Sequence, residues 1–279
     1  MTVTEHAYAK VNLVLRVGAP RADGLHPLCS RFASLALADT VRVETSDADT
    51  VECPGVAGEN LAARAAVAFR GVAPELPPLR MTIDKRIPVG GGLGGGSADA
   101  AAVLRAANRL TGAALDAAEL RRLAAQLGSD VPSQVEPRHA LVSGVGERVE
   151  PAELPAMPLV LVPQREGLST ATVYAELDRL RSRGGRPTDA ALDPEPLRRL
   201  AAQPLHALAA AFENDLQPAA MSLRPELERP LASLVRAGAL AAQVTGSGPT
   251  TFGVFDDRAA ATAAAAQIEG AIVTEARTC

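Results

Sequence analysis

The stretch Pro88–Leu104, PVGGGLGGGSADAAAVL, joins a glycine loop directly to an amphipathic helix, and it decides how the rest of the chain is interpreted. Six of the seven residues from Gly90 to Gly96 are glycine, and only Leu93 interrupts them. Glycine has no Cβ, so the backbone N–H groups of such a loop can converge on an anion. Apolar residues recur at helical spacing after Ser97, and the unpaired N–H groups of that helix N-terminus also favour an anion. The pattern therefore predicts a phosphate-binding loop followed by a helix.

Three other interpretations of the loop are weaker. A flexible linker would carry Ser or Pro and run into polar sequence, whereas this loop runs straight into an apolar helix face. Gly90-x-Gly92-x-x-Gly95 matches a dinucleotide fingerprint formally, but Pro88 separates it from the preceding strand, and no acidic residue ends a second strand about twenty positions on. A Walker A loop needs a Lys after the glycines, which is missing here. A nucleoside-triphosphate loop of another kind remains.

The composition limits the classes of protein that the chain can be. Its 279 residues suffice for one large domain or two ordinary ones. The net charge of −4 argues against binding nucleic acid or anionic lipid through the overall field, so an anionic ligand needs local donors. Cys29, Cys53 and Cys279 are far apart, which predicts neither a disulfide framework nor a zinc site. We see no leader and no run of about 18 apolar residues, so we expect a cytoplasmic protein without a membrane partner.

Lysine is rare in this chain, because 26 of the 28 basic residues are Arg and only Lys10 and Lys85 are Lys. Such a chain is expected to keep Lys where a compact ammonium is needed, although two surface lysines kept by chance are the alternative. Lys10 lies in the alternating segment Tyr8–Val17, which predicts a half-buried strand. Lys10 and Asn12 are then adjacent on one face of that strand.

In the amino-terminal half, strand patterns come first and helices follow. The expected elements are strands at Leu37–Glu44, Thr50–Cys53 and Leu79–Lys85 and a helix at Asn60–Phe69. Asp116 and Glu119 form a capping-box pattern for a further helix that ends at Gly128. Asp130 follows in a turn, where we expect Val131 to be extended because a proline comes next. By itself, an Asp in such a turn is more typical of a local hydrogen-bond partner than of a catalyst.

A proline-rich segment, Glu150–Pro158, predicts a domain boundary, which we place between residues 152 and 153. The elements expected beyond it are strands at Leu159–Val162, Leu240–Thr245, Thr251–Phe255 and Ala271–Glu275, helices at Thr170–Arg183, Glu226–Ala237 and Asp257–Glu269, helical pieces over Leu197–Phe212 that are broken at Pro204, and a loop at Gly184–Pro187. Without the inserted helices this order is β-α-β-β-α-β, the split βαβ arrangement. The turn Thr245–Pro249 between the middle strands suits a plain hairpin as well as a substrate or phosphate contact. We therefore predict an α+β fold with two domains, 1–152 and 153–279.

Together these residues resemble the GHMP family of small-molecule kinases over essentially the whole chain. The resemblance is carried by Ala9–Leu13, Asp23–His26, Lys85–Ala101, Asp130–Pro132 and Val244–Thr250. Within that superfamily the chain is most similar to kinases of the methylerythritol phosphate route to isoprenoids. The resemblance implies a ribosomal-S5-like N-terminal domain and a ferredoxin-like C-terminal domain. It also implies transfer of the γ-phosphoryl of ATP, assisted by Mg²⁺, to the 2-hydroxyl of 4-diphosphocytidyl-2-C-methyl-D-erythritol.

The resemblance assigns roles to individual residues. Lys10 and Asp130 are implied to be catalytic, beside the hydroxyl that is phosphorylated. The residues implied to bind ATP are Pro88, Gly90, Gly91, Gly92, Leu93, Gly94, Gly95, Gly96 and Ser97, with Asn60 and Lys85 added from their positions. The residues implied to contact the substrate are Asn12, His26, Thr245, Gly246, Ser247 and, against the cytosine ring, Tyr174. The metal ligands stay open, and Ser97 is a candidate.

Two positions depart from the family pattern. Leu25 stands before His26 where a Tyr is usual, which removes one of two expected ring partners for the cytosine. Ser133 and Gln134 stand where apolar or aromatic residues are usual, and we expect neither departure to touch the phosphoryl-transfer residues. A GHMP kinase for another small alcohol, or a catalytically silent ATP-binding regulator, are the alternative functions. We expect a monomer or weak homodimer without a nucleic-acid partner, and Asp130 could be a base or an orienting group.

Overall fold

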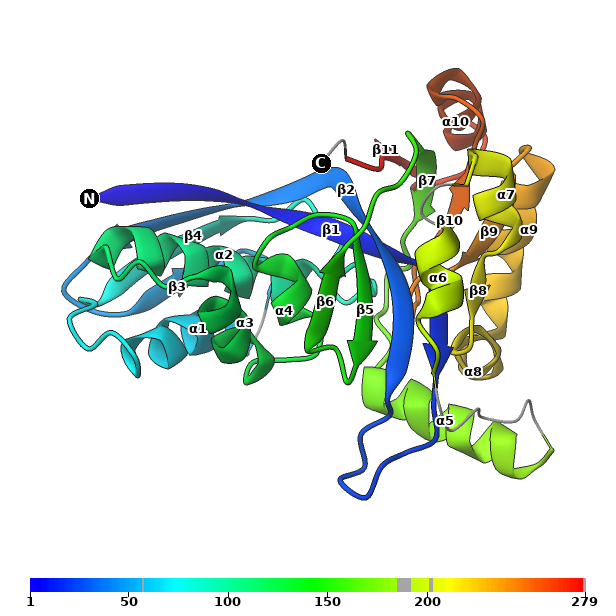
Figure 1. Cartoon of the computed structure of the whole chain (residues 1–279). Helices are drawn as coiled ribbons and strands as arrows, with labels where there is room; N and C mark the ends of the chain where they lie inside the picture. Colours follow the sequence, from blue (N-terminus) through cyan, green and yellow to red (C-terminus); the bar gives the residue numbers. More distant parts are fainter. Residues whose placement is uncertain (57, 185–191, 201–202, 278–279) are drawn as a thin grey trace.

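The computed structural model describes residues 1–56, 58–184, 192–200 and 203–277, and it consists of two β-sheets with their helices (Figure 1). The expected loop at Gly184–Pro187 lies mostly, and Cys279 wholly, outside these residues. The first sheet has seven strands in the order β3-β4-β2-β1-β8, and β5 pairs with β2 and β6. Its strands are β1 (Thr2–Val17), β2 (Leu28–Thr45), β3 (Thr50–Glu52), β4 (Leu79–Asp84), β5 (Ala140–Gly144), β6 (Arg148–Pro151) and β8 (Glu213–Asn214).

Strand β1 is longer and more buried than its sequence pattern indicated. It begins at Thr2 instead of Tyr8, and Lys10 is buried like its apolar neighbours, so the expectation of a half-buried strand is wrong. The reason is that β1 contacts a different layer along each part of its length. Val3 packs against helices, whereas beyond the register shift at Tyr8/Lys10 the residues Val11 and Leu13 pack against the second sheet.

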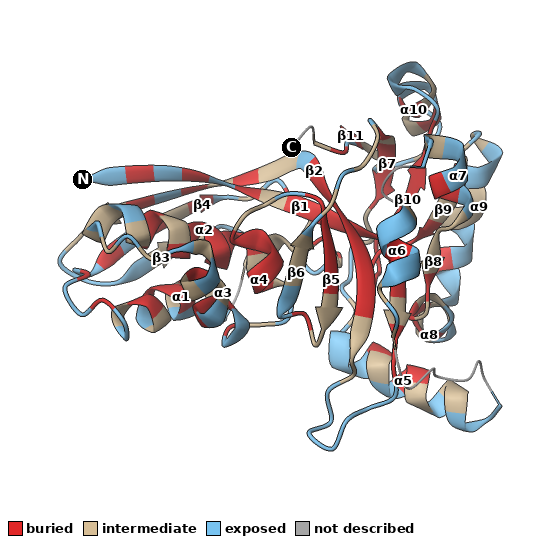
Figure 2. Ribbon diagram, viewed as in Figure 1, coloured by how far each residue is buried: buried red, intermediate tan, exposed pale blue. Residues whose placement is uncertain are grey.

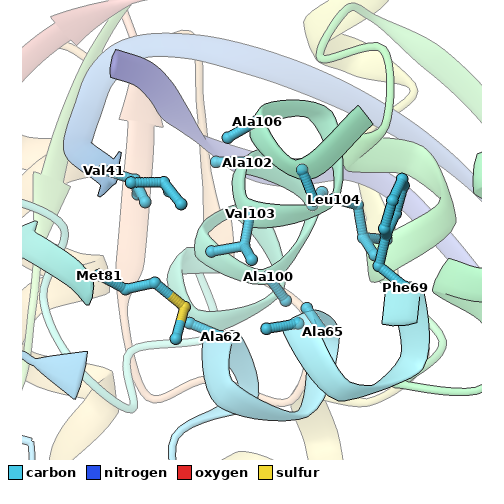
Figure 3. Packing of buried hydrophobic residues seen from close by; sticks show 14 of the residues in the cluster. Val41, Ala62, Ala65, Phe69, Met81, Ala100, Ala102, Val103, Leu104 and Ala106 are labelled. Atoms are coloured by element: carbon cyan, nitrogen blue, oxygen red, sulfur yellow. The ribbon is translucent and has the colours of Figure 1, made fainter. Parts of the chain in front are cut away.

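Four helices cover one face of the first sheet: α1 (Leu61–Arg70), α2 (Gly95–Thr111), α3 (Ala117–Ala125) and α4 (Val131–Gln134). Helix α2 is central, and its small residues, such as Ala100, let α1 pack close beside it (Figure 3). Phe69 fills the space at the end of α1. The predicted capping box of Asp116 and Glu119 is present at the start of α3. Burial of α2 fixes the position of its N-terminus, where the glycine loop ends.

The second sheet has four strands in the order β11-β7-β10-β9, all antiparallel to their neighbours. The strands are β7 (Pro158–Val162), β9 (Ala241–Val244), β10 (Thr251–Val254) and β11 (Ile272–Glu275). The helices of this half are α5 (Thr170–Ser182), α6 (Glu195–Arg199), α7 (Leu205–Ala210), α8 (Gln217–Leu223), α9 (Glu228–Arg236) and α10 (Arg258–Ala265), with a 3-10 turn at Pro225–Leu227. With the extra helices set aside, this is the predicted split βαβ order.

The two sheets share a core, which explains why buried residues run from β1 and β2 into β7 and β10 (Figure 2). Leu13 and Leu35 of the first sheet pack with Leu161 and Phe252 of the second. The chain passes from one sheet to the other between β6 and β7, so we propose that the division at 152/153 separates two domains. Strand β8, however, returns to pair with β1. In the described part of the chain, no helix is both long and apolar enough to cross a membrane.

Candidate active site

The glycine loop is a left-handed turn that is hydrogen-bonded on both sides. Gly90, Gly92 and Gly94 have positive φ angles of 70°, 77° and 72°, which glycine adopts without strain. The backbone N–H of Lys10 donates to the carbonyl of Leu93 at 2.9 Å, which fastens the loop to β1. Thr250 N donates to Gly91 O at 3.3 Å, which fastens it to the loop after β9. The loop therefore lies where the two sheets meet.

Neighbouring atoms leave no space for side chains at part of this loop. A Cβ at Gly92 would lie 2.8 Å from the carbonyl oxygens of both Thr245 and Gly248. A Cβ at Gly94 would lie 3.0 Å from Cγ of Lys10. At Gly96, by contrast, no atom lies within 4 Å of the Cβ position. The glycines therefore allow close packing at one end of the loop and open space at the other.

That open space belongs to a cavity of about 350 Å³ at the N-terminus of α2. All the residues that the sequence predicted to bind ATP line it: Pro88, Gly90, Gly91, Gly92, Leu93, Gly94, Gly95, Gly96, Ser97, Asn60 and Lys85. Asn60 also caps α1, since its Oδ1 accepts from Ala62 N at 2.9 Å. Cys53 and Asp99 line the cavity as well and were not predicted. We call this space the nucleotide cavity.

Lys85 lies partly buried in the wall of the nucleotide cavity, between two carboxylates. Its Nζ lies 2.5 Å from Asp39 Oδ2 and 2.8 Å from Asp99 Oδ2. Asp39 also accepts from the backbone N–H groups of Arg86 and Ile87, so its charge is well compensated. Burial raises the pKa of Asp99 to about 7, and the charge of Asp39 adds to this effect while Lys85 opposes it. One ammonium thus pairs with two carboxylates, and the negative charge of Asp99 is less well compensated than that of Asp39.

Lys10 and Asn12, adjacent on β1 as predicted, meet Asp130 at the centre of the site. Lys10 Nζ donates to Asn12 Oδ1 at 2.9 Å and lies 3.2 Å from Asp130 Oδ2. The side chain of Lys10 is 5% exposed and that of Asp130 is 36% exposed. The ammonium also lies 4.8 Å from the centre of the Phe32 ring. A cation is therefore fixed beside an accessible carboxylate.

Contacts from β2 and from the loop after β9 fix Asn12 in turn. Thr245 Oγ1 accepts from Asn12 N at 3.1 Å, and Asn12 Nδ2 donates to Ser30 Oγ at 2.9 Å. A Cβ at Gly246 would lie 3.2 Å from Asn12 Oδ1, and the φ of Gly246 is +56°. The next residue, Ser247, has its Oγ 3.0 Å from Thr170 Oγ1 of α5. The predicted residues Thr245, Gly246 and Ser247 are thus brought to the reaction centre.

Two amide side chains that the sequence analysis did not identify hold this arrangement together. Asn214 Nδ2 donates to the carbonyls of Val244 and Gly246, at 2.8 Å each. Gln243 Nε2 donates to the carbonyls of Asn12 and Leu13 at 2.8 and 2.9 Å. Both residues are buried and both contacts join distant parts of the chain, so no local pattern could have indicated them.

Asp130 is positioned by two residues whose roles were missed. Ser133 Oγ donates to the carbonyl of Asp130 at 2.7 Å, so the expectation that Ser133 does not touch the phosphoryl-transfer residues is wrong. Gly146 of the β5–β6 turn packs on Ser129, where a Cβ would lie 2.3 Å from the Ser129 carbonyl oxygen. Val131 is helical, not extended, because it begins α4. The backbone of Asp130 is thus held from both sides.

Asp130 lines a larger cavity of about 630 Å³, which we call the base cavity. His26 and Tyr174, predicted to contact the substrate, line it with their ring centres 4.9 Å apart at an interplanar angle of 48°. Leu25 also lines it and is 50% exposed. Burial raises the pKa of Tyr174, and the charge of Asp130 raises it further. Asp178, on the same helix as Tyr174, lines the cavity and was not predicted.

A small space of about 120 Å³ around Lys10 shares lining residues with both cavities. Gly92 and Gly94 line both this space and the nucleotide cavity. Asp130 and Tyr174 line both this space and the base cavity. A phosphorylated donor on the glycine loop and an acceptor in the base cavity would therefore meet at Lys10 and Asp130. An ammonium and a carboxylate at that point suit phosphoryl transfer to a hydroxyl.

Comparison with known proteins agrees with this geometry. The family model described as GHMP kinases N terminal domain matches residues 60–136, and that described as GHMP kinases C terminal matches residues 192–272. The chain belongs to the GHMP kinase family. It is therefore a small-molecule kinase with the two-domain GHMP fold, and the resemblance seen in its sequence is confirmed.

Relatives named 4-diphosphocytidyl-2-C-methyl-D-erythritol kinase are similar over most of their length. The protein of Nocardia farcinica is 44% identical over 96% of this chain and 90% of its own. Those of Streptomyces avermitilis and Mycolicibacterium smegmatis are 44% and 43% identical, over 90% and 97% of this chain and 87% of each relative.

Two solved structures extend the comparison. A crystal structure of 4-(cytidine 5'-diphospho)-2C-methyl-D-erythritol kinase has a TM-score of 0.80 and 34% identity, covering 99% of this chain and 100% of that chain. L. major mevalonate kinase in complex with R-mevalonate has a TM-score of 0.70 at 16% identity, covering 99% of this chain and 96% of that one. The second likeness shows the fold alone.

Proposed function

We propose that this GHMP kinase transfers the γ-phosphoryl of ATP to the 2-hydroxyl of 4-diphosphocytidyl-2-C-methyl-D-erythritol. The observation that carries the proposal is the meeting of two cavities at Lys10 and Asp130. The nucleotide cavity has a backbone wall suited to phosphates, and the base cavity is lined by the His26 and Tyr174 rings, which suit a pyrimidine. The names of the relatives that are 43–44% identical supply the particular alcohol.

In this proposal Asp130 accepts a hydrogen bond from the reacting hydroxyl and so orients it toward the γ-phosphoryl. Lys10 stabilises the charge that develops between the hydroxyl oxygen and the transferred group. Asn12 keeps the ammonium in place, since its Oδ1 accepts from Lys10 Nζ at 2.9 Å. Phosphoryl transfer needs little covalent help, so alignment and charge account for most of the rate. Asp130 is also the group placed to accept the hydroxyl proton.

Mg²⁺ fits the proposed site as a partner of the nucleotide. In the part of the chain that the structure describes, no three His, Cys, Asp or Glu side chains gather to hold a metal. Mg²⁺ in such enzymes is held largely by substrate phosphates and water, so few protein ligands are needed. Ser97, which lines both the nucleotide and the base cavity, would be one of them. When bound, the ion neutralises phosphate charge.

The proposed function is tested with the purified protein, Mg–ATP and three alcohols in separate assays: 4-diphosphocytidyl-2-C-methyl-D-erythritol, mevalonate and homoserine. We expect the cytidine compound to give the highest kcat/KM, and ³¹P NMR of the product to show a new phosphomonoester. Asp130→Asn should abolish the signal, which excludes a contaminating kinase. A higher kcat/KM with mevalonate or homoserine would reject the proposed substrate, and no turnover with any alcohol would favour a silent regulator.

The regulator is the weaker alternative, because the Lys10–Asp130 contact is intact and accessible from both cavities. A GHMP kinase for another alcohol is the alternative that the base cavity can decide. A cytoplasmic location and a monomeric or weakly dimeric state stay predictions of the sequence.

A further inference from the structure

The imidazole ring of His26 lies between two side chains of helix α5. The ring is tilted at 48° to that of Tyr174, with ring centres 4.9 Å apart, and its Nε2 is 3.0 Å from Asp178 Oδ1. The side chain of His26 is 7% exposed and that of Asp178 is 41% exposed. His26 belongs to the β1–β2 loop, so the contact with α5 joins two segments far apart in sequence.

Helix α5 presents one face to the base cavity. Thr170, Tyr174 and Asp178 follow one another at four-residue spacing, which places them on the same side of a helix, and all three line the cavity. The helix is fastened at its other residues. Arg181 Nη2 donates to the carbonyl of Val17 at 2.9 Å, and Glu176 Oε1 accepts from Ser222 Oγ at 2.6 Å on α8. Asp178 therefore contacts His26 from a helix whose position is fixed by other contacts.

The contact with Asp178 decides which nitrogen of His26 carries the proton. An ionised carboxylate only accepts hydrogen bonds, so the Nε2 that faces it must be the N–H. The neutral ring then has an unprotonated Nδ1, which can only accept. Among the residues that the structure describes, no protein group pairs with Nδ1 of His26. His26 thus lines the base cavity, and its Nδ1 is available to accept a hydrogen bond from a ligand.

An acceptor at this place distinguishes the two common pyrimidines. Cytosine carries a 4-amino group that donates hydrogen bonds, whereas uracil carries an oxygen at the same position that only accepts. A buried acceptor that meets another acceptor leaves both unpaired, and such mismatches discriminate strongly between ligands.

We infer that Asp178 is a positioning residue that fixes the Nε2–H tautomer of His26 and thereby makes the base cavity select cytosine over uracil. The inference rests on the proposed function, because it concerns the base of the acceptor substrate. Asp178 acts through His26, because it faces Nε2 of the ring and leaves Nδ1 for a ligand.

Kinetics of Asp178→Ala with the cytidine substrate and with its uridine counterpart provide the first test. We expect KM for the cytidine substrate to rise about tenfold, which corresponds to one charged hydrogen bond, with kcat within about threefold of the wild type. The preference for cytidine over uridine should narrow by a similar factor. Asp178→Asn should restore most of the lost preference for the cytidine substrate, because the amide oxygen can still accept from Nε2–H. Glu269→Ala, which removes an exposed acid beyond the end of α10 that lines none of the three cavities, is the matched charge control.

The tautomer itself is measured without any substrate. Long-range ¹H–¹⁵N spectra of the protein, with His26 assigned by a His26→Gln variant, should show Nε2 protonated and Nδ1 unprotonated in the neutral form of the ring. In Asp178→Ala the two tautomers should mix, and in Asp178→Asn the Nε2–H form should return.

An Nδ1–H tautomer in the wild type, or an unchanged cytidine preference in Asp178→Ala, would overturn the inference. If the wild type turned over neither nucleotide substrate, the proposed function would fail. The spectra would then still decide whether Asp178 fixes His26.

Discussion

The nucleotide cavity and the base cavity both border the small space around Lys10 and Asp130, but they are built from different parts of the chain. The phosphate end of the nucleotide cavity is backbone, because the loop from Gly90 to Gly96 has almost no side chains. The base cavity is made of side chains, chiefly from the β1–β2 loop and α5. Backbone recognition suits any triphosphate, whereas side chains choose the alcohol. In the proposed function, the nucleotide cavity therefore accounts for the type of reaction, and the base cavity accounts for the choice of substrate.

The two regions also differ in their exposure. The glycine loop is hydrogen-bonded to β1 through Lys10 N and to the loop after β9 through Thr250 N. At the edge of the base cavity, Leu25 is 50% exposed. Substitutions near the shared pair should therefore reduce turnover, whereas substitutions in the base cavity should change KM.

Replacing Lys10 with Arg should have the largest effect, because it tests the pair that both cavities share. Lys10 Nζ is held 2.9 Å from Asn12 Oδ1 and 3.2 Å from Asp130 Oδ2. The wider guanidinium keeps the charge but displaces it, and an error of about 1 Å can cost roughly 100-fold in rate. We expect kcat to fall about 100-fold, with ATP affinity by calorimetry and the thermal midpoint nearly unchanged.

Two further variants test the physical reason for this loss. Asp130→Asn should behave as Lys10→Arg does, and the double variant should fall little below the worse single one, because both side chains serve one hydroxyl. Arg86→Lys, whose side chain is 67% exposed, should leave turnover unchanged. Near-normal turnover in Lys10→Arg would show that general positive charge suffices, and the scarcity of lysine would then say nothing about the site.

A valine at Gly96 should affect the nucleotide cavity alone. A Cβ at Gly96 meets no atom within 4 Å, so the fold has room for the side chain. Its methyl groups would nevertheless occupy the space at the start of α2 where phosphates are proposed to lie. KM for ATP should rise at least about tenfold, or about 1.4 kcal/mol, with kcat at saturating ATP and the melting temperature little changed.

Gly94→Val is the contrasting variant. Its Cβ would lie 3.0 Å from Lys10 Cγ at a backbone φ of +72°, so it should lose kcat as well as ATP affinity. Unaltered ATP binding by Gly96→Val in calorimetry would mean that the triphosphate does not lie on this loop.

The sequence predicted the features whose cause is local. The glycine loop, the capping box at Asp116 and the adjacency of Lys10 and Asn12 depend on residues a few positions apart, and the structure has all three. The split βαβ order of the second sheet followed from hydrophobic periodicity alone. The meeting of Lys10 with Asp130, by contrast, came from the family resemblance.

Features that depend on distant contacts were missed. Asn214 and Gln243 act through carbonyl groups of other segments, and nothing in their own neighbourhood marks them. The burial of Lys10 was underestimated because the second sheet and its loop cover that part of β1. Val131 was expected to be extended, but Pro132 occupies the first turn of α4, where its missing N–H costs nothing. Asp178 could have been found, since it follows Tyr174 by one helical turn.

Leu25→Tyr tests whether the base cavity sets KM. Leu25 offers an apolar contact but no aromatic face, and the cavity already contains the rings of His26 and Tyr174. An aromatic partner for the cytosine should add about 0.5–1.5 kcal/mol, which is roughly two- to twelvefold in KM. We expect KM for the cytidine substrate to fall by that factor with kcat little changed. Leu25→Met keeps an apolar side chain of similar volume and should leave KM near the wild-type value. A higher KM in Leu25→Tyr would place the base elsewhere or exclude a cytidine substrate.

The smallest expected effect is a pH dependence of ATP binding that arises in the wall of the nucleotide cavity. Burial raises the pKa of Asp99 to about 7, so this carboxyl is mostly neutral at pH 6 and mostly charged at pH 8. A negative charge facing an anionic ligand opposes binding, and one unit charge is worth about 1 kcal/mol, or roughly fivefold in affinity. ATP should therefore bind about fivefold more weakly at pH 8 than at pH 6, beyond any change caused by the titration of ATP itself. Asp99→Asn keeps an acceptor for Lys85 but cannot ionise, so in calorimetry its affinity should vary with pH only as ATP does. If wild type and variant show the same ratio of affinities at the two pH values, Asp99 does not change its charge beside the bound nucleotide, and the cavity recognises ATP through its backbone and Lys85 alone.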